Sequence, residues 1–431
     1  VPHSNDWTEI SANNEPGDRR FVQAAGPFTL EPGAVNNVTV GVVYARSAST
    51  DPFETLKALQ RADDKAQALF DNCFKLVDGP PAPDMTMQEL DRELILTLFN
   101  TPSSDNANED YKEFDTRIPA TVTVDTVDVA ADQYYHFQGY QVYQLKNNTI
   151  SASDIRDPDK ARLAFQCDFK DSVSRLINFI FDPDLGFSVP TEMVDGKNEG
   201  IKHSFSVKND LFAQGDNRLV NHKRYYYLAI AYAHNEYAPY DPDNALLLGG
   251  QKLPYLAGRF NARGAQIAVY EGVPHIPAPE LMGTVTNAGY GDGVEITRIE
   301  GAGNTGNFME ITKESENAIL ANNEVEQLTY KAGKGPISIQ VIDPLEVKPG
   351  SFAIKFFPDS NGLLNEANWE LYDLITGDTI HSEKSILIGN EQLLPEYGIS
   401  IHVENRAWEA MVSNNYKTDA IGGALIYADS S

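Results

Sequence analysis

The fold is decided by the stretch "RLVNHKRYYYLAIAYA", residues 218–233, which carries the strongest strand signal in the chain. Its second half is a run of aromatic and aliphatic side chains, the types that are enriched in β-strands. Successive side chains of a strand face opposite sides, so we expect Tyr225 and Tyr227 in a core and Tyr226 at the surface. Weaker patterns of the same kind predict strands at 93–100, 137–145, 162–169 and 203–207, with a polar loop at 100–117.

The order of these segments resembles a fibronectin type III domain. A proline-rich start is followed by "LILTLFN", by "GYQVYQL" and by a Leu-x-Asn-x-x-x-Tyr-Tyr turn into the strand quoted above. That family carries a Tyr in its third strand and a Leu and a Tyr leading into its sixth. The resemblance therefore implies a β-sandwich whose core includes Tyr140, Leu219, Tyr225 and Tyr227.

The resemblance covers about residues 80–236 and has two departures from the family pattern. The second strand ends in Phe99, where the family commonly has Trp. The segment is also longer than the roughly 100 residues of such sandwiches. We expect insertions at 100–133 and 146–200 to account for the extra length.

We expect a mainly β fold made of tandem antiparallel β-sandwich domains with one amphipathic linker helix. The segment "DGPPAPD", 78–84, is a stiff proline-rich joint of the kind that separates domains. A Pro/Gly-rich stretch follows the quoted strand. These boundaries predict a partial β domain at 1–50, a helix and linker at 51–77, a fibronectin type III-like sandwich at 78–236, a connector at 237–264 and a C-terminal β-sandwich at 265–431.

The N-terminal part combines a predicted strand pair with the most convincing helix. Residues 20–46 alternate apolar and polar side chains around a Pro-Gly turn, which indicates an antiparallel pair. Asp51 is a natural N-cap before a helix at 52–73. Two or three strands are too few for an independent sheet. We therefore expect this segment to complete its sheet with strands from another part of the protein or from a neighbouring copy.

Short strands separated by turns are predicted throughout the C-terminal part, with a helix near 313–321. Residues 374–381 read as a hairpin with Gly377-Asp378 at its tip. Strands and helices do not alternate, so a parallel α/β sheet is unsupported. The predicted strands are 265–272, 293–300, 307–312, 336–342, 351–357, 368–375, 379–382 and 398–404.

The charge balance excludes some partners. The chain of 431 residues holds 62 acidic and 34 basic residues, a net charge of −28. Such a surface repels nucleic acid and anionic lipid, and it suits high solubility or the binding of divalent cations. No apolar run approaches a membrane span, and no signal peptide is visible. Because the chain begins with Val in mid-pattern, we infer a piece of a longer protein.

No sequence motif supports an active site. Gly301-Ala-Gly303-Asn-Thr-Gly306 has the G-x-G-x-x-G spacing of a dinucleotide-binding turn, but both flanks read as short strands. We interpret it as a loop. His136 and His222 are expected to be structural, and Tyr226 is a weak candidate for stacking on a sugar. We predict no catalytic residue and no bound organic cofactor. Cys73 and Cys167 are either two buried thiols or one bridge.

Acidic turns are the better candidates for a function. Closely spaced Asp and Asn side chains in a loop can supply several of the oxygens that Ca²⁺ requires. The same residues beside Pro or Gly are ordinary turn formers, which is the more frequent case. Two such clusters are Asp154 with Asp157 and Asp159, and Asp359 with Asn361. The calcium candidates are Asp182, Asp184, Asp241, Asp243 and Asn244.

"GPFTLEPG", "ADDKAQALFDN" and "YKAGKGPISIQVIDP" resemble segments of large secreted or surface-displayed proteins of Bacteroidetes, many of them exported by type IX secretion. The resemblance implies an extracellular or cell-surface location. We expect a non-enzymatic structural or display protein whose partners are other copies or other parts of a longer parent protein, with polymerisation into a filament or layer as one outcome. The alternative is an accessory, polysaccharide-binding or spacer region of a larger secreted hydrolase.

Overall fold

The computed structural model divides the chain into two compact units, Val1–Val77 and Asp78–Ser431, so the boundary coincides with the predicted proline-rich joint. The structure describes residues 8, 11–15, 17–18, 20, 22–24, 26–29, 31–33, 35, 40–46, 52–71, 77–124, 127–182, 185–244, 247, 249–294, 296–297, 310–322, 328–332, 337–358, 360, 366–386 and 391–403.

In the first unit the predicted helix is present as α1, Pro52–Asp71, with an ion pair of 2.7 Å between Lys57 and Glu54 on consecutive turns. The strand pair predicted for 20–46 is not formed among the residues described there. Among its described apolar side chains, Val40, Val42 and Tyr44 are 70%, 93% and 82% exposed. An isolated hairpin is marginal in water, and no described sheet of this unit covers these side chains.

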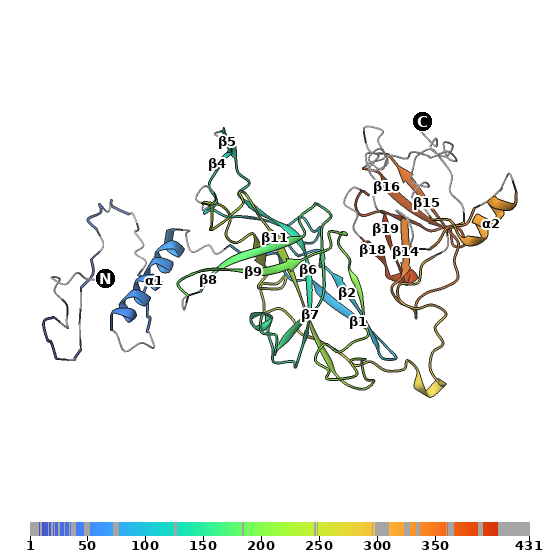
Figure 1. Ribbon diagram of the computed structural model, residues 1–431, viewed down its shortest axis with the longest axis horizontal. Coiled ribbons are helices and arrows are strands. Elements are labelled where there is room, and N and C mark those ends of the chain that lie inside the picture. The colour runs from blue at the N-terminus through green and yellow to red at the C-terminus, as the bar shows by residue number, and fades with distance from the viewer. Residues whose placement is uncertain are drawn as a thin grey trace. The chain divides into compact units, whose positions relative to one another are not determined.

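The second unit begins with a sandwich module, residues 78–272, in which two antiparallel sheets face each other (Figure 1). One sheet has the order β1-β2-β10, and the other runs β12-β11-β6-β3, with β7 on β6 and β13 on β11. The strands are β1 Asp84–Leu90, β2 Glu93–Phe99, β3 Lys112–Phe114, β6 Tyr134–Leu145, β7 Ala161–Asp168, β10 Ser204–Val207, β11 Tyr225–His234, β12 Tyr255–Ala257 and β13 Tyr270–Gly272.

The core of the sandwich module lies between these sheets. Leu94, Leu96 and Phe205 from the first sheet pack against Val142 and Ala229 from the second. The four residues that the fibronectin type III resemblance placed in the core are all buried there, with exposures of 1% for Tyr140, 1% for Leu219, 2% for Tyr225 and 0% for Tyr227. Phe99 instead stays 42% exposed at the end of β2.

The turn before β11 is closed by a side chain. The Tyr225 hydroxyl accepts a hydrogen bond of 2.9 Å from the backbone N–H of Val220, and the chain turns at His222 with a φ of +64°. A Tyr that bonds back to the backbone a few residues upstream is the tyrosine corner of β-sandwiches. The strand predicted from 218 therefore begins only at Tyr225, because 218–224 form this corner.

β11 is buried on both faces. Its second face is covered by a separate apolar cluster that contains Leu228, Ile230, Ile150 and Ile267. Where β6 passes β11 the pairing shifts register beside Gly139, at which a Cβ atom would lie 2.1 Å from the carbonyl oxygen of Cys167. Only glycine fits this close approach of backbones.

The insertions contribute strands that the sequence patterns did not predict. Two hairpins extend from the module, β4–β5 at Thr121–Val124 and Val127–Ala130, and β8–β9 at Arg175–Asp182 and Phe187–Asp195 (Figure 1). The polar loop contains β3, the connector contains β12, and the strand predicted at 265–272 is reduced to β13. Local periodicity missed these pieces because they are short or sit on a long loop.

The C-terminal module, residues 289–403, is a second pair of antiparallel sheets, with the orders β14-β19-β18 and β15-β16-β17. They enclose one apolar cluster around Trp369, Leu371 and Ile401. Gly377, with a φ of +85°, lies in the predicted β16–β17 hairpin. The elements are α2 Lys313–Ala321, β14 Ile337–Val341, β15 Phe352–Phe357, β16 Asn368–Asp373, β17 Thr379–His381, β18 Glu391–Leu394 and β19 Ile399–Val403.

These sheets confirm the predicted mainly β, antiparallel fold and the helices at 52–73 and 313–321. The predicted strand at 293–300 reduces to isolated bridges at Gly293 and Ile296 in its described part, and Gly301–Gly306 lie outside the described residues. The helix that follows this glycine motif begins only at Lys313, capped by Thr312.

The Tyr225→Phe substitution tests the corner. It removes the acceptor of the Val220 N–H in a largely exposed turn, so we expect the free energy of unfolding in urea to fall by about 0.5–1.5 kcal/mol. Tyr226→Phe is the matched control, because the Tyr226 hydroxyl has no hydrogen-bond partner among the described residues. We expect the control to stay within about 0.5 kcal/mol. Equal effects of the two changes would contradict the role of the corner.

Candidate functional site: a charged junction between the two β modules

The two modules of the second unit meet through buried polar side chains. Glu391, at the start of β18, is 4% exposed and reaches the segment that leads into β10. Its backbone N–H donates to the Ile201 carbonyl at 3.0 Å. Its carboxylate accepts from the backbone N–H of His203 at 2.8 Å and from the Ser204 hydroxyl at 3.2 Å. One residue of the C-terminal module thus satisfies several groups of the sandwich module.

Glu109 lies on the other side of the junction, in the loop between β2 and β3. Its carboxylate is 5% exposed and touches a cation from each module. Oε1 lies 2.5 Å from Nε2 of His203, and Oε2 accepts from Nζ of Lys384 at 2.6 Å. The Tyr140 hydroxyl also donates to Oε1, at 3.1 Å.

The loop holds Glu109 in an unfavourable backbone conformation. Its φ is +58°, a region that favours glycine, and its N–H donates to the Asn106 carbonyl at 3.0 Å. Asn106 is itself fully buried. Strain of this kind persists only where surrounding contacts fix it. Here the contacts that fix it are those of the carboxylate with His203, Lys384 and Tyr140.

The charged groups of the junction shift the pKa values of Glu109 and His203. Burial raises the pKa of Glu109, but hydrogen bonds and positive charge from His203 and Lys384 lower it more, to about 2. Burial lowers the pKa of His203, but the hydrogen bond and charge of Glu109 and the charge of Glu391 raise it more, so the net pKa lies above its ordinary value. The pair is therefore a carboxylate beside an imidazolium.

The polar groups of the junction bind one another, and both ring nitrogens of His203 face oxygens of the protein. A general base needs a ring nitrogen that is open to the reacting group. In His203 Nε2 faces Glu109 and Nδ1 faces the Glu391 carbonyl at 2.9 Å. The neighbouring Ser204 hydroxyl contacts Glu391 and Tyr290, not the imidazole. The geometry supports docking of two modules.

Sequence patterns did not find the junction. Its contacts join residues that are 94, 188 and 275 positions apart, so no local spacing reveals them. Glu109 stands in the segment that the sequence showed only as a polar loop. The sole local sign is a carboxylate flanked by turn formers ahead of an aromatic residue, which is common in exposed loops.

The calcium candidates take part in turns in the structure. Asp241 accepts from the backbone N–H of Asp243 at 2.9 Å, and Asn244 N–H donates to the Asp241 carbonyl. Asp182 accepts from the Leu185 N–H at the tip of the β8–β9 hairpin. Asp184 lies outside the described residues. Among the described residues no group of three or more His, Cys, Asp or Glu side chains could hold a metal ion. Calcium binding stays a prediction.

The other singled-out residues have structural surroundings. His136 sits within β6, paired with Lys112 of β3, and its Nε2 lies 2.8 Å from Asp132. The backbone N–H of His222 donates to the Pro274 carbonyl. Tyr226 is half-buried against the second apolar cluster of the sandwich module. The acidic turn at Asp154 is closed by Lys160, whose hydrogen bond lowers the pKa of Asp154 to about 2.

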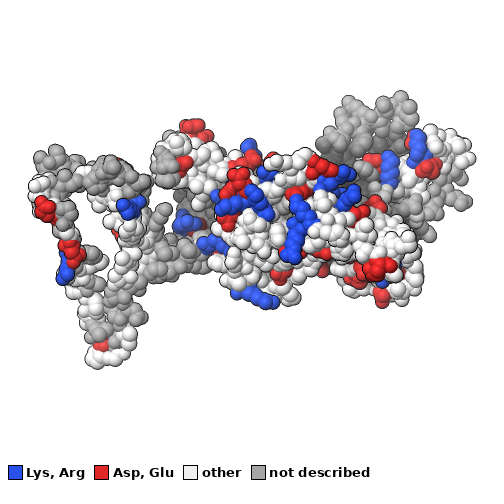
Figure 2. Space-filling view, turned by 90° about the horizontal axis from the view of Figure 1, so that it is seen from below, with Lys and Arg blue, Asp and Glu red and all other residues white. Residues whose placement is uncertain are grey.

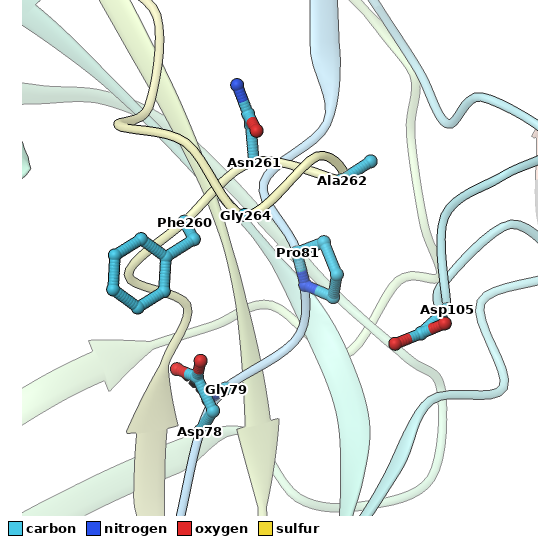
Figure 3. A pocket seen from close by; sticks show the side chains of 8 residues that line it. All are labelled: Asp78, Gly79, Pro81, Asp105, Phe260, Asn261, Ala262 and Gly264. Carbon is cyan, nitrogen blue, oxygen red and sulfur yellow. Dashed lines mark hydrogen bonds between the residues drawn. The ribbon is translucent and has the colours of Figure 1, made fainter.

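A small pocket lies where the chain enters the sandwich module (Figure 3). Its volume is about 170 Å³, below the roughly 300–1,000 Å³ of sites for small molecules. Of its two carboxylates, Asp78 forms an ion pair of 3.1 Å with Arg259, and Pro81 lies between Asp78 and Asp105 in Figure 3. The lining residues are Asp78, Gly79, Pro81, Asp105, Phe260, Asn261, Ala262 and Gly264.

Comparison with known proteins gives no relative: no protein-family model, curated protein or solved structure matches the chain. Of the helices in the described part of the chain, none has both the length and the apolar composition of a membrane span. The function is therefore inferred from the geometry and from the sequence resemblances.

Glu109→Ala tests the energetic weight of the junction. The change leaves the partly buried His203 and Lys384 without their shared carboxylate, so we expect a loss of about 1.5–3 kcal/mol in the free energy of unfolding. Glu192→Ala is the control, because Glu192 pairs with Arg175 at 2.8 Å in solvent and should cost less than about 1 kcal/mol. Similar losses in a urea titration would show that the junction carries no special weight.

The calcium prediction has a direct test in thermal unfolding. A cation that binds only the folded chain stabilises it, so the melting temperature should be higher in millimolar calcium than in EDTA. Magnesium at the same concentration controls for ionic strength. Superimposable melting curves in all three solutions would refute a structural calcium site.

Proposed function

We propose that this chain is a non-enzymatic structural or display part of an extracellular or cell-surface protein. The observation that carries the proposal is the charged junction, in which buried side chains from both modules fix one β module on the next. Buried ion pairs stabilise little, but they specify geometry because a misplaced charge is costly. A fixed angle and spacing between modules is what a display or spacer element requires.

We also propose that the sandwich module is fibronectin type III-like. Support comes from the tyrosine corner at Tyr225 and from the burial of the four residues that the resemblance named. The order of the chain through the sheets adds to it, since the first, second and a later strand form one sheet and the remaining long strands form the other. The exposed Phe99 is the main departure.

The surface charge is compatible with the extracellular location that the resemblance to secreted Bacteroidetes proteins implies. The net charge of −28 favours solubility, and on the face shown in Figure 2 acidic and basic side chains alternate without a broad patch of one sign. Such a face does not attract a polyanion. It is compatible with a spacer that must avoid non-specific binding.

Self-association is the most direct way for such a chain to act. In the first unit Val40, Val42 and Tyr44 occupy alternate positions and are 70%, 93% and 82% exposed. An extended segment with an apolar face can add as a strand to an exposed sheet edge of another molecule. Because donor and acceptor surfaces differ, each added copy would leave a new free end, and the assembly would propagate.

One observation favours the alternative, an accessory region that binds polysaccharide. The β8–β9 hairpin carries Phe181 and Phe187 at 52% and 57% exposure near its tip. Exposed aromatic rings on a projecting hairpin are a recognised feature of binding surfaces. Retention of a monomeric chain on insoluble polysaccharide, lost in Phe181→Ala but kept in Phe357→Ala, would favour this alternative.

Light scattering on the purified chain tests the proposed assembly. We expect the average mass to grow with concentration, because each copy offers one donor segment. The Val42→Lys variant should remain monomeric, since a charge on the apolar face cannot be buried in a sheet without a partner. Val285→Lys, at 85% exposure and outside residues 20–46, is the control and should assemble normally. A concentration-independent monomer in every form would defeat the assembly proposal.

A further inference from the structure

Both ring nitrogens of His203 face hydrogen-bond acceptors. Nε2 lies 2.5 Å from the carboxylate of Glu109, and Nδ1 lies 2.9 Å from the backbone carbonyl oxygen of Glu391. Neither oxygen can donate while Glu109 is ionised, so each nitrogen must carry a proton. The docked geometry therefore requires the imidazolium form of the side chain.

A neutral imidazole cannot meet this requirement. With the proton on Nε2, the lone pair of Nδ1 would point at the Glu391 carbonyl. With the proton on Nδ1, the lone pair of Nε2 would point at the Glu109 carboxylate. In either tautomer one of two contacts becomes repulsive, either the one with Glu391 across the junction or the one with Glu109 in the same module. A half-turn of the ring does not help, because it would place the carbon atoms Cδ2 and Cε1 where Nδ1 and Nε2 now face the two oxygens.

We propose that His203 makes the junction a proton-dependent latch, which docks the C-terminal module on the sandwich module while the imidazole is protonated and loosens when it loses its proton. The latch is a property of the junction and does not depend on whether the chain serves display or polysaccharide binding.

The charged groups around His203 come from several elements, and the two carboxylates among them both favour its protonated form. Glu109 faces it from the β2–β3 loop, Glu391 from β18, and Lys384 reaches the far oxygen of Glu109 from the turn after β17. The Tyr140 ring of β6 lies 6.2 Å from the imidazole, and its hydroxyl donates to Glu109. Burial is the largest influence that raises the pKa of Tyr140 well above 10, so Tyr140 stays neutral through the range that matters.

The sign of the pH dependence follows from two shifted groups. The pKa of His203 is raised in the docked state, first by Glu109, which belongs to the same module and stays beside it, and then by Glu391, whose influence is lost when the junction opens. The contribution of Glu391 favours docking while His203 is protonated and is lost as pH rises through the raised pKa. The pKa of Glu109 is lowered from 4.5 to about 2, so its contribution is complete above 4.5 and is lost only as pH falls toward 2. Docking is therefore favoured while His203 is protonated and Glu109 is ionised, and it weakens as pH rises through the raised pKa of His203 or falls toward 2.

The latch is reversible because the two modules share no apolar cluster among the described residues. The hydrophobic clusters formed by described residues each lie within one module, around Val142 in the first and Trp369 in the second. Each module therefore keeps its own core when the junction opens. What changes on opening is the set of polar contacts centred on Glu109, His203 and Glu391.

Hydrogen exchange on the full chain tests the latch. The backbone amides of His203 and Glu391 donate across the junction, so their protection reports docking. Corrected for the intrinsic effect of pH, their protection factors should fall about tenfold per pH unit between the undocked and docked pKa values of His203. Amides of Leu228 and Leu371, inside separate sheets, should keep constant protection.

Substitutions separate the latch from a fixed junction. In His203→Gln the side chain stays neutral, so protection should be low already at pH 5.5 and independent of pH. In Glu109→Gln the amide can accept from or donate to Nε2, so the pH dependence should flatten. His381→Gln is the control, because His381 is exposed on β17 and pairs with Glu370 away from the junction.

Three results would overturn the proposal. The first is constant protection of the junction amides from pH 5.5 to 9 in the unmodified chain, which needs no variant to fold. The second is an unchanged pH profile in Glu109→Gln or His203→Gln. The third is a profile that shifts equally in His381→Gln, since the titrating group would then lie elsewhere.

Discussion

The sandwich module is built around β11, which is buried on both of its faces and has partner strands along both of its edges. β6 pairs along one edge, and β12 and β13 share the other. A strand in this position needs apolar cover above and below, and the two apolar clusters around it supply this cover. Ile150 and Ile267 belong to the second cluster, although Ile150 comes from a predicted insertion and Ile267 from the predicted C-terminal domain. Long loops of this module are therefore part of its core.

The sequence predicted the fold where a strand carries its own pattern. β2, β6, β7 and β11 are long runs with clear periodicity, and the corner at Tyr225 has a recognisable spacing. β12 is three residues long, and its position is set by tertiary contacts, namely its pairing with β11 and the hydrogen bonds of Tyr255 with Asn178 of β8. The opposite failure occurs at 20–46, where the pattern is strong but no described strand forms. Periodicity reports which face of a strand is apolar, and it does not report whether a partner is present.

The charged junction lay beyond sequence reasoning for a different reason. His203, Glu109 and Glu391 each stand in ordinary local surroundings, and their meaning arises only when the two modules meet. The acidic turns at Asp182 and Asp241 had the opposite character, because they are conspicuous in the sequence and serve as turn formers in the structure. Abundant carboxylates in an acidic chain make isolated clusters poor guides. The informative carboxylate is the one that is buried beside cations from separate parts of the chain.

The burial of Cys167 bears on the role of thiol chemistry in this module. Its thiol is buried on β7, where it donates to the Lys202 carbonyl at 3.4 Å, and it is free of any disulfide. Burial raises the pKa of this thiol to about 12, and since only the thiolate attacks a disulfide, the group is chemically silent in the folded module. Cys73, with which a bridge was the alternative, lies outside the described residues. Cys167 is the one cysteine among residues 78–272, so no disulfide forms within the sandwich module, and its fold does not depend on thiol oxidation.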